Sequence, residues 1–179
     1  YMEKLAALQN SADLWSQAGS RYYRTSEVVD ESARGTLIQK ASECYNNSLK
    51  IDSTNLNTKV GIAQCLVEGG GSPMQGIQMI EGVLRKDSNN ENGQLALGEF
   101  SIQSGQYSKA IYRFNRVLQI DPGFIEAYLY LEDIYEKMGN KQDAVRCLKK
   151  YSTFVHDKKI KEQVEGYIRK LENDTIANK

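Results

Sequence analysis

A repeat with a period of 34 to 35 residues is the feature that most limits how this chain can fold. Three similar segments carry it: SLKIDSTN, VLRKDSNN and VLQIDPGF. Their aspartates are Asp52, Asp87 and Asp121, and a leucine stands three residues before each of them. A period of about 34 residues fits one antiparallel pair of helices with two short turns. Because such a pair cannot bury its apolar stripe alone, we expect the pairs to stack on one another.

Helical periodicity supports this expectation independently of the repeat. Between residues 91 and 122, apolar residues recur at the spacing of two amphipathic helices, with Gly105 between them and Pro122 after the second. Residues 125–151 repeat the pattern on either side of Gly139. The sequence therefore predicts an all-α fold.

At these positions the chain resembles the tetratricopeptide repeat family, whose pattern is W-x-x-L-G-x-x-Y, then A-x-x-x-F, then P. One unit matches through Leu97, Gly98, Ala110, Phe114 and Pro122. The matches in the other units are Trp15, Ala18, Gly19, Tyr22, Ala41 and Tyr45; Ile62, Ala63, Leu66, Gly76, Ile80 and Val83; and Leu131, Tyr135, Ala144 and Leu148. The resemblance implies a right-handed α-solenoid of about four helix pairs with a C-terminal capping helix. Bacterial adaptor and scaffold proteins of this family are the most similar kind.

The resemblance also sets the expected boundaries. The four repeats are expected at about 12–55, 56–90, 91–124 and 125–155, with a capping helix at 156–173 and a frayed tail at 174–179. Residues 1–11 are expected to form a short helix or to be disordered. In the first repeat, about ten residues are inserted between Tyr22 and Ala41. We expect them to lengthen the two helices, with Gly35 near the turn, and a surface loop is the alternative.

Charge and hydropathy limit the classes of partner. The chain has 23 Lys and Arg and 23 Asp and Glu, so its net charge is zero and no nucleic-acid partner is expected. No apolar run reaches the roughly 18 residues of a membrane helix, so this fragment should not insert into a membrane directly. We expect a soluble fragment, cytoplasmic or periplasmic if bacterial. The first residue is Tyr1 rather than Met, so a signal, anchor or second domain outside this sequence is also considered.

The sequence offers no catalytic constellation. His156 is the only histidine, which excludes histidine-based triads and metal sites. Cys44, Cys65 and Cys147 lack zinc-ligand spacing and are expected to be buried. The adjacent carboxylates Glu132 and Asp133 would point in different directions on a helix and are expected to be solvated. We predict a non-enzymatic protein without catalytic residues, bound metal or cofactor.

In the family that the chain resembles, the first helix of each repeat lines a concave groove. The residues expected there are Tyr23, Asn57, Val60, Gln64, Val67, Asn92, Leu95, Glu99, Ile102, Glu126, Leu129, Asp133 and Glu136. The aliphatic members would form an apolar floor, and the acidic members would lie toward the C-terminal end. An apolar strip beside charge favours a protein or peptide partner with apolar anchors and basic flanks. The family's clamp of Lys, Asn and Arg for chaperone tails has no counterpart in this set.

Three hypotheses for the function follow from this pattern. The first is a protein-interaction scaffold that binds a protein or peptide segment in the groove. The alternative to an open groove is one that is plugged by the chain's own N-terminal segment or whose aliphatic residues pack between helices. The second hypothesis is a structural or homo-oligomerising module, whose groove or terminal faces meet another copy of the chain. The third is an accessory domain of a larger protein whose activity lies outside this chain.

Overall fold

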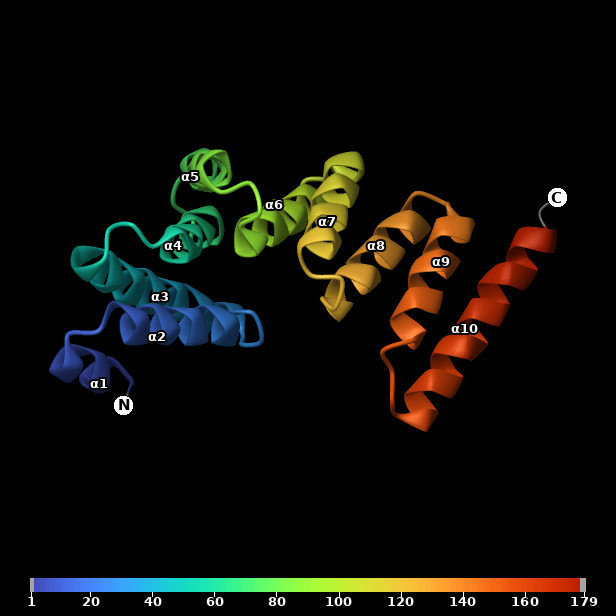
Figure 1. Cartoon of the computed structure of the whole chain (residues 1–179), viewed down its shortest axis with the longest axis horizontal. Helices are drawn as coiled ribbons and strands as arrows, with labels where there is room; N and C mark the ends of the chain where they lie inside the picture. Colours follow the sequence, from blue (N-terminus) through green and yellow to red (C-terminus); the bar gives the residue numbers. More distant parts are fainter. Residues whose placement is uncertain (1, 178–179) are drawn as a thin grey trace. The chain divides into compact units, whose positions relative to one another are not determined.

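The computed structural model describes the backbone of residues 2–177 and the side chains of residues 2–173, which form helices joined by short turns (Figure 1). The helices are α1 (Met2–Gln9), α2 (Ala12–Ser26), α3 (Glu31–Ile51), α4 (Leu56–Glu68), α5 (Pro73–Lys86), α6 (Glu91–Gln103), α7 (Tyr107–Ile120), α8 (Ile125–Lys137), α9 (Lys141–Ser152) and α10 (Lys158–Ala177). The chain divides into two compact units, Tyr1–Ala96 and Leu97–Lys179, which we call unit 1 and unit 2; the division falls within α6.

Within each unit, every helix packs against the next along the chain. Unit 1 stacks α1 through α5 in order, and unit 2 stacks α7 through α10. The pairs α2–α3, α4–α5, α6–α7 and α8–α9 correspond to the repeating unit, and α10 follows the last of them. The prediction of an all-α solenoid of about four helix pairs with a helix after the last pair is confirmed.

The three repeated aspartates share one structural role. Asp52, Asp87 and Asp121 stand directly after α3, α5 and α7, and their backbone N–H groups donate to the carbonyl four residues earlier at 2.9, 2.9 and 2.8 Å. Their Oδ1 atoms accept the backbone N–H two residues later at 2.9, 3.0 and 2.8 Å. Each aspartate therefore closes a turn that ends one helix pair and leads into the next. The repeat motif belongs to the architecture rather than to a binding site.

Tyr45 of α3 is the centre of the core of unit 1. Its ring is 4% exposed and lies between Gly19 of α2 and Gly61 of α4. A Cβ atom at Gly19 would lie 2.8 Å from ring atoms Cδ1 and Cε1, and one at Gly61 would lie 2.7 Å from Cε1 and Cε2. The hydroxyl of Tyr45 donates to Ser20 Oγ at 3.2 Å. These two glycines thus allow three helices to meet around one aromatic ring.

The core of unit 2 also places an aromatic ring against a glycine of a neighbouring helix. The ring of Phe114 in α7 is fully buried, lies against Gly98 of α6 and stacks on Tyr130 of α8 with ring centroids 4.7 Å apart. Toward the C-terminus, α10 contributes Ile168 and Leu171 to a cluster with apolar residues of α9. The lysine-rich helix α10 therefore covers α9 with its apolar face, as a capping helix does.

Some expected positions differ from the structure. The insertion in the first repeat lengthens α2 and α3 to 15 and 21 residues, but the turn lies at residues 27–30 and Gly35 is inside α3. The helix α3 starts after Asp30, whose carbonyl accepts the N–H of Ala33 and Arg34 at 3.0 and 3.1 Å. At the N-terminus, the helical alternative is the one adopted, as α1. Residues 174–177, expected in a frayed tail, continue α10; residues 178–179 lie outside the described residues.

Candidate functional site

Of the predicted groove residues in unit 1, two belong to its core. Tyr23 is 5% exposed and packs in the cluster around Tyr45, and Val60 is 1% exposed. This burial corrects their assignment to an open groove, because neither side chain is accessible to a partner. The half-buried members are Gln64, Val67 and Leu95, and the exposed members are Asn57 and Asn92.

The exposed Asn57 has a structural partner. Its Oδ1 accepts a hydrogen bond from Asn90 Nδ2 at 2.8 Å, and Asn90 in turn accepts the backbone N–H of Gly93 at the start of α6. The side chain of Val67 lies against the backbone of Gly76 in α5. Packing and helix capping therefore account for much of the predicted set in unit 1.

In unit 2, the predicted residues are exposed or half-buried. Glu126 and Leu129 are exposed, and Glu99, Ile102, Asp133 and Glu136 are half-buried. The hydroxyl of Tyr130 in α8 donates to the carboxylate of Glu99 in α6 at 3.0 Å. This hydrogen bond joins α6 to α8 within unit 2.

A second tyrosine joins α10 to the same surface. The hydroxyl of Tyr167 donates to Glu136 Oε2 of α8 at 2.7 Å. Leu129, Asp133 and Glu136 share one side of α8 by their spacing of three and four residues. We call the surface formed by Glu99, Leu129, Tyr130, Glu132, Asp133, Glu136 and Tyr167 the acidic face. It includes Tyr130, Glu132 and Tyr167, which were not among the predicted site residues.

The carboxylates of α8 crowd one another. Burial, which is the largest cause, raises the pKa of Glu132 to about 7 together with the charges of Glu136 and Asp133 and a hydrogen bond to Glu136. Among the described residues, the buried Oε1 atom of Glu132 has no hydrogen-bond partner. Glu132 was expected to be solvated; it is instead half-buried, and it lies one turn before Glu136 on the same side of α8.

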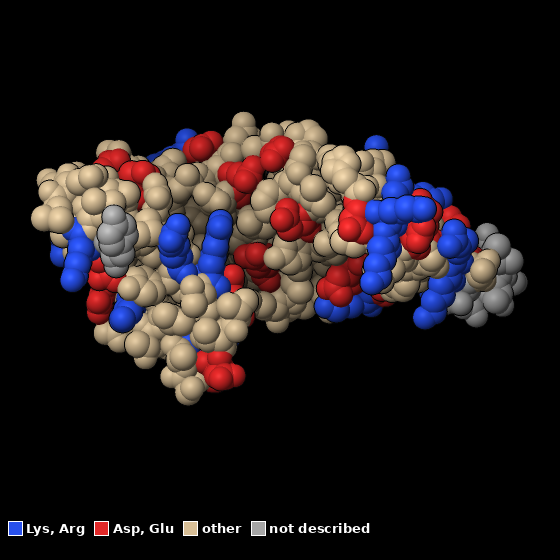
Figure 2. Space-filling model, turned by 90° about the horizontal axis from the view of Figure 1, so that it is seen from below, with Lys and Arg blue, Asp and Glu red and all other residues tan. Residues whose placement is uncertain are grey.

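The carboxylates raise the pKa of a neighbouring tyrosine and of a neighbouring lysine. The hydrogen bond to Glu136 raises the pKa of Tyr167 to about 12, so the phenol remains a donor at neutral pH. Lys137 pairs with Asp133 at 2.6 Å, and this bond raises the pKa of its ammonium group. Over α9 and α10, by contrast, acidic and basic side chains stand next to one another (Figure 2), as in the pair Lys149–Glu172 at 2.8 Å. The acidic face is thus a local excess of negative charge that favours a cation.

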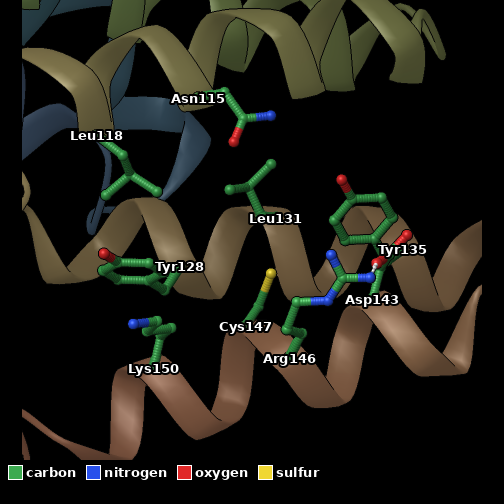
Figure 3. A pocket seen from close by; sticks show the side chains of 9 residues that line it. All are labelled: Asn115, Leu118, Tyr128, Leu131, Tyr135, Asp143, Arg146, Cys147 and Lys150. Atoms are coloured by element: carbon green, nitrogen blue, oxygen red, sulfur yellow. Dashed lines mark hydrogen bonds and ion pairs between the residues drawn. The ribbon is translucent and has the colours of Figure 1, made fainter.

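Two small cavities are lined by described residues. One, of about 290 Å³, lies between α1 and α2 and is bordered by Tyr22, whose hydroxyl donates to the carboxylate of Glu3. The other, of about 170 Å³, lies between α7, α8 and α9 in unit 2 (Figure 3). It uses Tyr128, Leu131 and Tyr135 of α8 and so lies on a different side of that helix from Leu129 and Asp133.

Within the described part of the chain, no group of three or more His, Cys, Asp or Glu residues is placed to hold a metal ion. The helices there are also too short or too polar to cross a membrane. The three cysteines are buried, as predicted. Burial raises the pKa of Cys44 to about 11, that of Cys65 to about 12 and that of Cys147 to about 11, so their thiols are poor nucleophiles.

Comparison with known proteins identifies the repeat. Residues 101–159 match the family described as tetratricopeptide repeat. No curated protein matches the chain. Among solved structures, MamA is 19% identical over 93% of this chain and 87% of its own, with a TM-score of 0.59. PilW, described as a widely conserved type IV pilus biogenesis factor, is 19% identical over 98% of this chain and 77% of its own, with a TM-score of 0.70.

A further similar structure is that of YrrB, described as a TPR protein with an unusual peptide-binding site. It is 16% identical over 92% of this chain and 87% of its own, with a TM-score of 0.58. At these identities, the likeness to all three proteins concerns the fold.

Proposed function

Because the chain belongs to the tetratricopeptide repeat family, we propose that it is a protein-interaction scaffold that binds a cationic peptide segment on the acidic face of unit 2. Proteins of this family generally act as non-enzymatic scaffolds that bind proteins or peptides. YrrB, with the same fold, is described as having a peptide-binding site, which supports the same mode of action for this chain.

The observation that carries the proposal is the arrangement of carboxylates on α6 and α8. Glu99 and Glu136 are each held by a tyrosine hydroxyl, at 3.0 and 2.7 Å, so their positions are set before a partner arrives. Leu129, 38% exposed, lies on the same side of α8 as Asp133 and Glu136. An arginine or lysine of the partner would meet the carboxylates, and an adjacent apolar side chain would cover Leu129.

Binding of a cation would also change the protonation of the site. A positive charge beside Glu132 favours its ionised form and lowers its pKa from about 7. Binding therefore releases a proton below pH 7, and the affinity for a cationic peptide should fall as the pH is lowered from 8 to 6.

The proposal is tested with a labelled, capped peptide of sequence Arg-Ala-Leu-Arg and a second peptide in which glutamate replaces both arginines. Fluorescence anisotropy should show binding of the arginine peptide, weakened by salt because the charges are screened over about 10 Å at 0.1 M. Glu136→Gln should reduce the affinity by about threefold or more, in the range of a lost ion pair.

The matched control is Glu165→Gln, an exposed glutamate of α10 outside the acidic face. It changes the net charge equally and should leave the affinity unchanged. Equal binding of the two peptides, or equal effects of the two variants, would overturn the proposal. Light scattering over a concentration series would then show whether the chain is instead a homo-oligomerising module.

A further inference from the structure

The cavity of unit 2 has the size of a site for one side chain. It encloses about 170 Å³ between α7, α8 and α9. Pockets for cofactors and drug-sized molecules typically measure about 300–1,000 Å³, whereas about 150 Å³ is enough for a benzene ring. Size therefore favours a single large apolar side chain of a partner over a small-molecule cofactor.

The lining of the cavity suits an apolar group. Leu118 of α7 and Leu131 of α8 face it, and Tyr128 and Tyr135 stand at its two ends along α8 (Figure 3). The ring of Tyr128 stacks on Phe154 with centroids 5.9 Å apart, which holds one of these ends in place. Rigid aromatic walls around an aliphatic base are typical of pockets that take an aromatic or aliphatic anchor.

The polar groups around the cavity favour a negative charge beside that anchor. The guanidinium of Arg146 pairs with Asp143, which neutralises both. Lys150 lies next to Tyr128 in Figure 3, and its ammonium group has no ion pair or hydrogen bond with the described residues. The same holds for the amide of Asn115 among these residues. The rim therefore carries one uncompensated positive charge and one available amide.

We propose that this cavity binds a peptide that inserts one large apolar side chain between Tyr128 and Tyr135 and places a carboxylate against Lys150. The carboxylate belongs either to an adjacent acidic residue or to the C-terminus of the peptide. The site shares no lining residue with the acidic face and selects the opposite charge, although the charge of Glu132 also acts on Cys147 in the lining of the cavity. Unit 2 then carries two recognition surfaces with opposite charge preferences.

Three capped or free peptides distinguish the sources of the carboxylate. The first is acetyl-Gly-Glu-Phe-Gly-amide, the second is acetyl-Gly-Gly-Phe with a free C-terminus, and the third is acetyl-Gly-Gln-Phe-Gly-amide. In a methyl NMR titration of the whole chain, we expect shifts at Leu118 and Leu131. At least one of the two carboxylate peptides should bind about threefold or more tightly than the glutamine peptide. Whichever does so identifies the source of the carboxylate.

Variants of exposed lysines keep the fold intact during this test. Lys150→Glu should remove the preference for a carboxylate, and Lys159→Glu, an equal charge change in α10 away from the cavity, should retain it. The proposal is overturned if the three peptides bind equally or if both variants have the same effect. Methyl shifts that leave Leu118 and Leu131 unchanged would also overturn it.

Discussion

Replacing Gly61 by alanine should destabilise unit 1, although alanine is the better helix former. In a helix interior, Gly→Ala stabilises by about 0.5–1 kcal/mol through backbone entropy. At Gly61, however, the new Cβ would lie 2.7 Å from two ring atoms of Tyr45. The ring cannot retreat, because its other side meets the backbone of Gly19, where a Cβ would also be only 2.8 Å away. Overpacking of this kind costs about 1–3 kcal/mol, so the net loss should be up to about 2.5 kcal/mol.

Gly35→Ala provides the matched control, because Gly35 is also within a helix but has no atom within 4 Å of the added Cβ. That variant should be stabilised by about 0.5–1 kcal/mol. Urea denaturation followed by the fluorescence of Trp15, the only tryptophan and a residue of α2, measures both free energies of unfolding in unit 1. The difference between the two free energies of unfolding gives the cost of packing the added Cβ atom against Tyr45. If Gly61→Ala were as stable as Gly35→Ala, the close approach of three helices around Tyr45 would be refuted.

Three further predictions concern other parts of the chain. The pKa of Glu132 is raised from 4.5 to about 7 in the fold, so its protonated form stabilises the protein below pH 4.5 and this contribution is lost as the pH rises through 7. The free energy of unfolding of Glu132→Gln should therefore exceed that of the parent by more at pH 8 than at pH 5. An equal difference at the two pH values would contradict the raised pKa. Arg34→Ala should lower the free energy of unfolding in urea by about 1 kcal/mol, because it removes the partner of Glu68, whose side chain is 11% exposed and lies 2.7 Å away. An unchanged midpoint would mean that the ion pair contributes nothing to stability. Leu129→Ser should change stability by no more than about 0.5 kcal/mol, whereas Leu131→Ser, in a side chain 3% exposed, should cost several kcal/mol; similar melting temperatures would show that Leu129 is also core.

The repeat made the fold predictable. The regular spacing of Asp52, Asp87 and Asp121 indicates a recurring turn. The spacing of apolar residues between these turns indicates which helix faces are buried. The position of the turn in the first repeat was not predictable in this way. Gly35 suggested a turn by residue type, but a glycine without close neighbours fits within a helix as well. The helix α3 begins after Asp30, whose side chain makes no capping hydrogen bond.

The candidate site was only partly predictable, for a physical reason. Spacing along a helix assigns a residue to a side but does not show how far neighbouring helices cover it. Tyr23 and Val60 were assigned to the groove, yet both are buried, and Tyr23 packs in the cluster around Tyr45. Conversely, Tyr167 belongs to a helix interpreted only as a cap, and its bond to Glu136 depends on the packing of α10. The lysines of α10 gave no indication that one of its tyrosines would face α8.

The most direct test of the acidic face is to map where the capped Arg-Ala-Leu-Arg peptide binds, using backbone amide NMR shifts of the whole chain. We expect the largest shifts in α8 around residues 129–136 and near Tyr167 in α10, with Leu118 of the neighbouring cavity unaffected. The shifts should shrink as salt is raised. Saturable shifts confined to other helices, with α8 unchanged, would contradict the central claim that this face recognises a cationic segment.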